Sequence, residues 1–242
     1  MRFYLTFELE KSSLPKDYRR IILSYIKKSL TEILDGRYYS QYFKDNIQKD
    51  FCFSLKLPKA KFTKDEIILE DNSIKVLFTS DDRQKTGLLL QQAFMKQKNK
   101  KFLITNQNSI TLKQIHQQRE QKITSSKVIF KTYGLCIRDH NKETNKDNHY
   151  VYSDEKFNKQ LKVVLKNQIS QTGFSKDIVD SIKFSPINCK KVLVKHYDTY
   201  VDTTVGSFLL EGNPLLLQYL YDVGMGSRNT MFGYLDLLTQ DL

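Results

Sequence analysis

The sequence predicts an α+β protein built from two tandem ferredoxin-like modules, each with the element order β-α-β-β-α-β. Alternating apolar residues mark the strands, and apolar residues spaced three and four apart mark the helices. The same six-element order occurs twice, with a divide near residue 120. We therefore expect an N-terminal ferredoxin-like domain at 1–120 and a C-terminal one at 121–242, the second carrying a glycine-rich loop.

The first half opens on a strand at residues 2–10, in which Phe3, Leu5, Phe7 and Leu9 alternate with polar side chains. Ser13 and Pro15 are typical of a helix start. The apolar face of that helix runs from residue 18 to 34, and Gly36 closes it. The further elements expected are a polar, tyrosine-rich loop at 37–50, a strand at 51–57, a strand or broken hairpin at 66–79, a helix at 84–97, and strands at 101–105 and 109–116.

The second half repeats the order. We expect a strand at 122–131, a polar insertion at 138–150, a helix capped by Ser153, a strand at 179–184 and a long bent hairpin at 190–210. Asn213 is a preferred N-cap, Pro214 suits the first helical position, and Gly224 suits the residue just past the end. These three residues predict a short helix at 214–223, and a final strand is expected at 234–238.

The composition indicates a polyanionic partner and a reducing compartment. The chain has 39 Lys and Arg against 27 Asp and Glu, a formal charge of +12, which favours a nucleic-acid partner. No run approaches the eighteen or so apolar residues of a membrane span, and no secretory leader opens the chain. The three cysteines form no CxxC pair, so neither a zinc site nor a disulfide framework is predicted, and a cytoplasmic location is expected.

A glycine-bearing loop at 224–233 carries the strongest functional signal. Gly224, Gly226 and Gly233 allow sharp turns and a close approach of the backbone to another chain. Ser227 and Arg228 lie inside this loop, where both side chains can meet phosphate. The alternative interpretation is a tight helix-to-strand connection with an incidental arginine.

The residues of this loop, GMGSRNTMFG, resemble the C-terminal glycine-rich motif of the CRISPR precursor-RNA processing endoribonucleases of the RAMP superfamily. The usual ending there is Gly-Phe-Gly, and Met231 departs from it. Several other segments resemble the clostridial-type branch of that family. They are Leu14–Arg20, Phe51–Ser54, Val128–Thr132, Arg138–Asn141 and Gly206–Gly212.

The resemblance implies tandem ferredoxin-like folds and cleavage of CRISPR repeat RNA without a metal or other cofactor. It implies that the RNA 2′-hydroxyl is the nucleophile, leaving a 2′,3′-cyclic phosphate or related end and a 5′-hydroxyl. Other CRISPR effector subunits are conceivable partners, a membrane is not, and the chain is expected to be a monomer or a homodimer.

The catalytic residues are less clear, because the histidine that many family members place after the first long helix is missing. The four histidines are at 116, 140, 149 and 196, and the corresponding stretch holds tyrosines and lysines instead. Their ordinary pKa values are about 10 and 10.4, so a general base would need a lowered pKa, whereas orienting or proton-donating roles would not. The candidate catalytic residues are Tyr38, Tyr39, Lys44 and Lys49. The alternative is that this cluster only packs against the neighbouring strand.

The insertion at 138–150 is the rival site. His140 has an ordinary pKa near 6.5 and would be the easiest base at neutral pH, unless it is only a solvated loop residue. Asp139, His140 and His149 match no standard metal-ligand spacing, so no metal is predicted. The residues expected to contact RNA are Lys131, Arg138, His140, Lys195, Gly224, Gly226, Ser227, Arg228 and Gly233.

Two other functions remain open at this point. A RAMP protein with this fold could hold guide RNA in an effector complex without cleaving it, and the missing histidine favours that alternative. An unrelated class is a basic ferredoxin-like regulator that binds small molecules. No phosphate-loop or Rossmann fingerprint supports that class.

Overall fold

The computed structural model describes residues 1–45, 47–57, 59–105 and 107–240. Contacts between Cα atoms group the chain into two compact units. Unit 1 comprises Met1–Arg119 with Lys195–Asp198, and unit 2 comprises Glu120–Val194 with Thr199–Leu242. Among the described residues, no helix is long and apolar enough to span a membrane.

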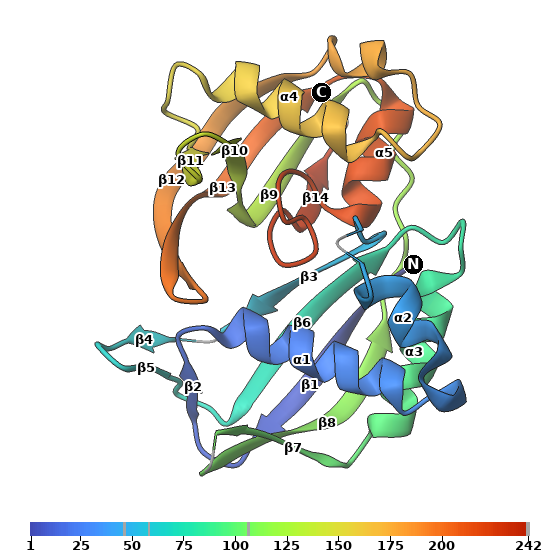
Figure 1. The fold of residues 1–242 in the computed structure, drawn as a ribbon, viewed down its shortest axis with the longest axis vertical. Coiled ribbons are helices and arrows are strands. Elements are labelled where there is room, and N and C mark those ends of the chain that lie inside the picture. The colour runs from blue at the N-terminus through green and yellow to red at the C-terminus, as the bar shows by residue number, and fades with distance from the viewer. Residues whose placement is uncertain (46, 58, 106, 241–242) are drawn as a thin grey trace. The chain divides into compact units, whose positions relative to one another are not determined.

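Unit 1 is built on a five-stranded antiparallel sheet in the order β3-β6-β1-β8-β7. The helices α1 and α3 lie against one face of this sheet (Figure 1). The four strands of this sheet other than the edge strand β7, taken with α1 and α3, follow the expected order β-α-β-β-α-β. The bounds are β1 Arg2–Leu9, α1 Tyr18–Thr31, β3 Phe51–Lys56, β6 Ser73–Ser80, α3 Thr86–Gln97, β7 Lys101–Thr105 and β8 Asn108–Gln117.

The core of unit 1 follows from the predicted alternation. Phe3, Leu5, Phe7 and Leu9 of β1 are all buried beneath the helices. The ring of Phe3 stacks on that of Phe78 with centroids 4.7 Å apart, so the aromatic side chains of neighbouring strands form one layer. The prediction of a half-buried first strand is confirmed.

The segment at 13–15 is a strand and not the start of the helix. β2 (Ser13–Pro15) pairs with β5 (Glu66–Ile68), which also pairs with β4 (Lys61–Phe62) in a separate small sheet. Leu14 lies opposite Ile67 in this register, and both side chains are buried. The burial of this pair opposes an early helix start. The expected hairpin at 66–79 is not formed, because β6 pairs on its two sides with β1 and β3, whereas β5 pairs with β2 and β4.

The polar segment after Gly36 is partly helical, which corrects the prediction of a loop at 37–50. A 3-10 turn at Leu34–Gly36 leads into α2 (Arg37–Phe43). Tyr42 is buried, and its hydroxyl lies 2.6 Å from Thr86 Oγ1, which donates in turn to Asp50 at 2.5 Å. This polar anchor holds α2, a helix of seven residues whose aromatic side chains recur at helical spacing.

Unit 2 is a four-stranded sheet in the order β12-β13-β9-β14, with α4 and α5 against one face (Figure 1). This is again the β-α-β-β-α-β order, so the predicted tandem ferredoxin-like architecture is confirmed. The bounds are β9 Lys127–Leu135, α4 Phe157–Gln168, β12 Lys183–His196, β13 Thr199–Glu211, α5 Pro214–Val223 and β14 Leu235–Thr239.

The α5 helix matches its prediction, whereas several neighbouring elements are shifted. The Asn213 side chain accepts a hydrogen bond from the Leu215 N–H at 2.9 Å, as an N-cap should. The helix α4 starts at Phe157, not at Ser153, and the strand expected at 179–184 is a 3-10 turn followed by the start of β12. The insertion at 138–150 is an antiparallel hairpin of β10 (Ile137–Asn141) and β11 (Lys146–Tyr150).

Candidate functional site

The glycine-rich loop of unit 2 is held by side chains that sequence reasoning did not single out. Gln168, at the end of α4, donates from Nε2 to the Gly224 carbonyl at 2.7 Å and accepts from the Gly226 N–H at 3.0 Å. Asn229 donates from Nδ2 to the Val223 carbonyl at 2.7 Å. Both amides are buried, so their bonds are protected from water and fix the course of the loop.

Two glycines of the loop are required by their surroundings. Gly226 has a φ of +100°, and a Cβ there would lie 2.7 Å from the Cys136 carbonyl oxygen. Gly233 has a φ of +90°, and a Cβ there would overlap the Met225 carbonyl oxygen. Any other L-residue would be strained and would displace neighbouring backbone. The loop is therefore a fixed frame packed on the backbone of its own unit.

Ser227 and Arg228 are presented by this frame. The Ser227 N–H donates to the Cys136 carbonyl at 2.8 Å, and Ser227 Oγ accepts from the Arg138 N–H at 3.0 Å. Arg228 has a φ of +55°, a left-handed conformation that costs a residue other than glycine about 1–2 kcal/mol. The loop thus joins the β10–β11 hairpin through Ser227, and it holds Arg228 in a strained conformation beside that hairpin.

Asp147 of β11 lies where three cationic or ionisable side chains converge, and we call Arg138, His140, Asp147 and Arg228 the Asp147 cluster. Arg138 Nη1 lies 3.2 and 3.0 Å from the two carboxylate oxygens, His140 Nδ1 lies 2.8 Å from Oδ1, and Arg228 Nη2 lies 3.2 Å from Oδ2. Partial burial acts to raise the pKa of Asp147. Hydrogen bonds from His140 and Arg138, together with the two arginine charges, outweigh it and lower that pKa.

His149 borders the Asp147 cluster but differs from His140. Burial, followed by the charge of Arg228, lowers the pKa of His149 and so favours its neutral ring. Its Nε2 is buried without a hydrogen-bond partner among the described residues. His140 is exposed and paired with Asp147, which places the two histidines of the predicted rival site in different environments.

Part of the predicted catalytic set gathers in unit 1 around one aromatic ring, and we call Lys27, Tyr39, Phe43 and Lys49 the Phe43 group. The Tyr39 ring centroid lies 5.6 Å from that of Phe43. The ammonium groups of Lys27 and Lys49 lie 5.1 and 5.4 Å from the Phe43 centroid. Burial, followed by the charge of Lys27, lowers the pKa of Lys49. Lys27 is not among the catalytic candidates predicted from the sequence.

Tyr38, Tyr42 and Lys44 lie outside the Phe43 group. Tyr42, in the same tyrosine-rich segment, is a structural residue: its hydroxyl is bonded to Thr86, and burial raises its pKa to about 12. Tyr38 is half-buried on α2, and Lys44 is exposed just after the last residue of that helix.

The two predicted RNA-contacting lysines on strands have different settings. Lys131 of β9 is exposed, with Nζ 5.7 Å from the Tyr133 ring centroid, and it lies opposite Asp236 of β14 in the sheet register. Lys195 is half-buried near the end of β12, in the short segment grouped with unit 1. These lysines do not belong to the Asp147 cluster.

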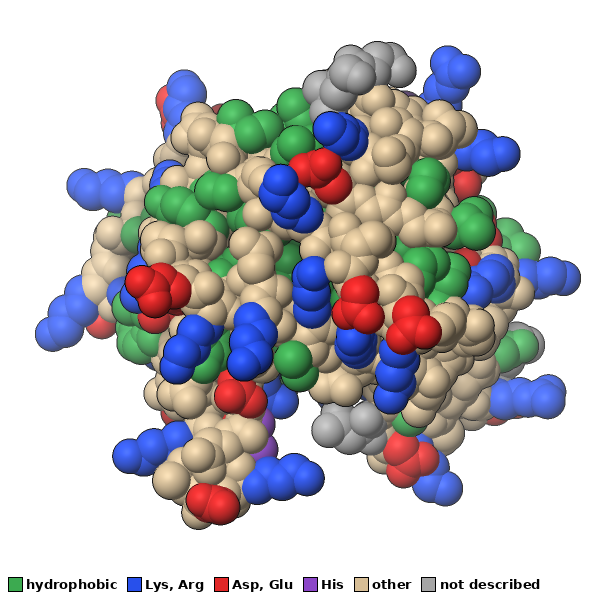
Figure 2. Space-filling model, turned by 90° about the horizontal axis from the view of Figure 1, so that it is seen from above, with side chains coloured by type: hydrophobic (Ala, Val, Ile, Leu, Met, Phe, Trp, Pro, Cys, Tyr) green, Lys and Arg blue, Asp and Glu red, His purple; other side chains and the backbone are tan. Residues whose placement is uncertain are grey.

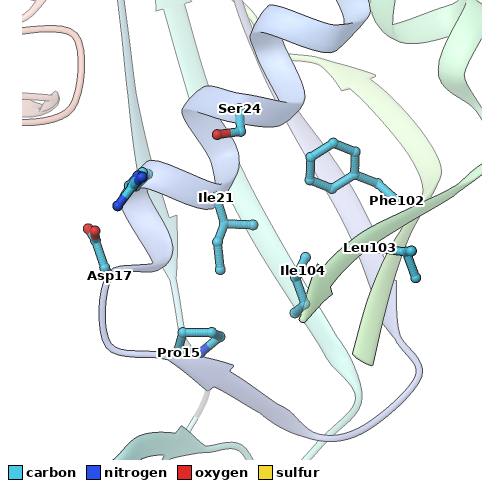
Figure 3. Close-up of a pocket in the computed structure, with 8 residues that line it drawn as sticks. Pro15, Asp17, Ile21, Ser24, Phe102, Leu103 and Ile104 are labelled. Carbon is cyan, nitrogen blue, oxygen red and sulfur yellow. The ribbon is translucent and has the colours of Figure 1, made fainter. Parts of the chain in front are cut away.

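Neither overall charge nor cavity volume points to a site. Lys and Arg side chains are spread over the face seen in Figure 2, with Asp and Glu among them. A pocket of about 300 Å³ in unit 1 is lined mainly by apolar groups of α1 and β7, including Ile21, Phe102, Leu103 and Ile104 (Figure 3). It holds none of the predicted site residues. Within the described part of the chain, no three His, Cys, Asp or Glu side chains are placed to hold a metal ion.

Comparisons with known proteins find solved structures with a similar fold. One solved structure with a similar fold is an RAMP protein that binds different RNA substrates; it is 19% identical, with a TM-score of 0.81, over 99% of this chain and 100% of that one. Another is a Cas6-related protein from Pyrococcus furiosus, which is 17% identical, with a TM-score of 0.83, over 100% of this chain and 99% of that one. A third is a CRISPR associated protein Cas6, which is 17% identical, with a TM-score of 0.74, over 99% of this chain and 99% of that one. No curated protein sequence matches the chain.

A family model gives the assignment. The model described as CRISPR associated protein Cas6, C-terminal, matches residues 116–237, which is about half of the sequence. This stretch includes the β10–β11 hairpin, the glycine-rich loop and every member of the Asp147 cluster. The chain therefore belongs to the Cas6 family of CRISPR-associated proteins.

Proposed function

We propose that this protein is a metal-independent endoribonuclease that binds CRISPR repeat RNA and cleaves within it to give mature guide RNA. The observation that carries the proposal is the family match over 116–237, because that stretch builds a rigid, cationic loop-and-hairpin surface. Phosphate binding needs fixed donors and positive charge, and this surface supplies both.

RNA binding is assigned first to the glycine-rich loop and the β10–β11 hairpin. Arg138 and Arg228 would pair with backbone phosphates, and Ser227 ties the two segments together. His140, Lys131 and Lys195 would add contacts or diffuse attraction. The glycines at 224, 226 and 233 contribute by letting the backbone of the loop lie close to its support.

Cleavage is assigned to the tyrosine and lysine segment of unit 1. The reaction moves the 2′-hydroxyl proton to a base, forms the bond from 2′-oxygen to phosphorus, breaks the phosphorus–5′-oxygen bond and protonates the leaving oxygen. Lys49 suits the proton-transfer role best, because its lowered pKa lies closer to neutrality than that of an ordinary lysine. Tyr38 and Tyr39 would orient the RNA, and Lys44 would stabilise charge at the phosphate.

The test is to incubate the purified protein with end-labelled repeat RNA in excess EDTA and to identify the product ends. We expect cleavage at one position, a 5′-hydroxyl on one fragment and a cyclic phosphate on the other. A scrambled RNA of equal length is the control for specificity. Cleavage that requires added divalent metal would contradict the mechanism.

The second candidate is a non-catalytic RNA-binding subunit, favoured by the absence of any histidine between residues 1 and 115. That candidate predicts tight, specific binding of the same repeat RNA with no fragment released after long incubation. The EDTA experiment therefore separates the two functions, provided that binding is measured on the same protein sample.

A further inference from the structure

A single carboxylate occupies the point where the cationic side chains of the Asp147 cluster converge. Three donor groups from two separate segments lie 2.8–3.2 Å from the Asp147 oxygens. Two come from β10 and one from the glycine-rich loop. This is the arrangement in which guanidinium and imidazole groups bind a phosphate, and here a side-chain carboxylate fills the same position.

Stability alone does not account for this arrangement. The side chains of Arg138, Asp147 and Arg228 are 34%, 26% and 26% exposed, and ion pairs with such access to water contribute little to folding. Arg228 also holds a left-handed conformation that glycine would adopt without strain. A strained arginine on a rigid loop is instead typical of a site that needs that charge at that place.

The charges near Asp147 do not cancel. Two arginines and one imidazole face one carboxylate, and Lys142 and Lys146 add positive charge on the exposed part of the hairpin. Asp139 and Glu143 are the other acidic residues of β10 and the turn, and no ion pair joins either to the arginines among the described contacts. The cluster therefore stays cationic, and it attracts an anion even while Asp147 is in place.

We propose that Arg138, His140 and Arg228 form a subsite for one backbone phosphate of the RNA, and that Asp147 is a built-in competitor displaced when this phosphate binds. The inference rests on the proposed RNA-binding function and adds its regulation. Asp147 lowers the affinity of the subsite for any phosphate. An RNA therefore displaces the carboxylate only when its contacts elsewhere make up for this penalty, so strands that make few contacts leave the subsite closed.

The displacement needs only a local change. Asp147 lies on a two-stranded hairpin whose second strand is largely exposed, so its side chain can turn away into water. Arg228 stays in place because its loop is fixed by Gln168 and by the close contact at Gly226. The arginine thus exchanges one oxyanion for another without rearranging the frame.

The test compares Asp147→Asn with the parent protein in binding assays with repeat RNA at fixed salt. Asparagine keeps the shape and removes the charge. We expect the Kd to fall about threefold to fivefold, the range expected for one partly exposed charge pair, and the affinity for scrambled RNA to rise at least as much. The matched control is Asp180→Asn, which removes an equal charge from an exposed pair with Lys166 in the same unit and should leave the Kd nearly unchanged.

A double mutant isolates the subsite. In an Arg228→Ala background the gain from Asp147→Asn should shrink, because one of the two arginines for which Asp147 and the phosphate compete is then missing. Equal gains from Asp147→Asn and Asp180→Asn would overturn the proposal in favour of a general charge effect. Weaker binding by Asp147→Asn, with an unchanged melting temperature, would also overturn it, since Asp147 would then position the arginines.

A second probe separates this inference from the proposed function. NMR of the arginine side chains during titration with inorganic phosphate should show shifts for Arg138 and Arg228 in Asp147→Asn at lower phosphate concentration than in the parent. If neither RNA nor phosphate moves these signals in either protein, the subsite does not exist. If phosphate does so and repeat RNA does not bind, the subsite serves free phosphate, and both the RNA assignment and the proposed function fail.

Discussion

The glycine-rich loop of unit 2 and the α2 segment of unit 1 hold their functional candidates by different means. The loop is fixed through glycines that no other residue can replace and through hydrogen bonds between the backbone and the buried amides of Gln168 and Asn229. The α2 segment is fixed through the side chain of Tyr42, and its candidates pack on the exposed side around Phe43. The glycines of such a loop can therefore be recognised from residue types alone, whereas the surroundings of a candidate catalytic group depend on how side chains pack.

The largest expected effect separates two lysines of the α2 segment. Lys49→Ala should slow cleavage about 10²–10⁴-fold, because a general base or acid is typically worth that much. RNA affinity should change little. Lys44→Ala makes the same chemical change at an exposed position and should slow cleavage less. Single-turnover kinetics measures the cleavage rates of both variants.

The pH dependence of the cleavage rate tests whether Lys49 is the general base. If Lys49 is the base, cleavage should rise with pH and level off below the ordinary lysine value of about 10.4, because its pKa is lowered. Lys27→Ala removes the neighbouring charge, so the midpoint should move to higher pH. A profile that is flat, or unmoved by Lys27→Ala, would assign proton transfer to another group.

The rigid frame can be broken at one glycine. Gly233→Ala combines a φ of +90° with a clash against the Met225 backbone and should destabilise the protein by about 2–4 kcal/mol, near the upper end for single substitutions. Gly173→Ala has a similar φ of +83° but open space around it, so it should cost only about 1 kcal/mol. Urea unfolding of both variants measures the difference, and equal losses would mean that the frame tolerates displacement.

Arg228→Ala tests whether the arginine held by the glycine-rich loop contributes to RNA binding. It should weaken RNA binding by about 1–3 kcal/mol, as expected for a charged hydrogen bond, with little effect on the single-turnover rate at saturating protein. Fluorescence anisotropy at fixed salt measures the affinity. Unchanged affinity would make the loop a purely structural connection.

The smallest effect is expected on the sheet of unit 2. Lys131→Ala should weaken binding by less than about 1 kcal/mol for all RNA sequences alike, and it should reduce the salt dependence by about one phosphate contact. A sequence-dependent loss would show that Lys131 contacts a base.

Sequence reasoning predicted the features fixed by local chemistry. The α5 helix followed from Asn213 and Pro214, and the tandem module order followed from apolar periodicity. It missed α2, because this helix is only seven residues long and depends on a long-range hydrogen bond between the Tyr42 and Thr86 hydroxyls. It missed Asp147, because only the register of the β10–β11 hairpin brings this residue opposite His140.

The central claim is that the RNA supplies its own nucleophile. The most direct measurement uses repeat RNA with a single 2′-deoxy substitution at the scissile nucleotide, in EDTA, beside the same RNA substituted at the next nucleotide. The account predicts undiminished binding of both, no cleavage of the first and normal cleavage of the second. Cleavage of the first RNA at the normal position would contradict the account.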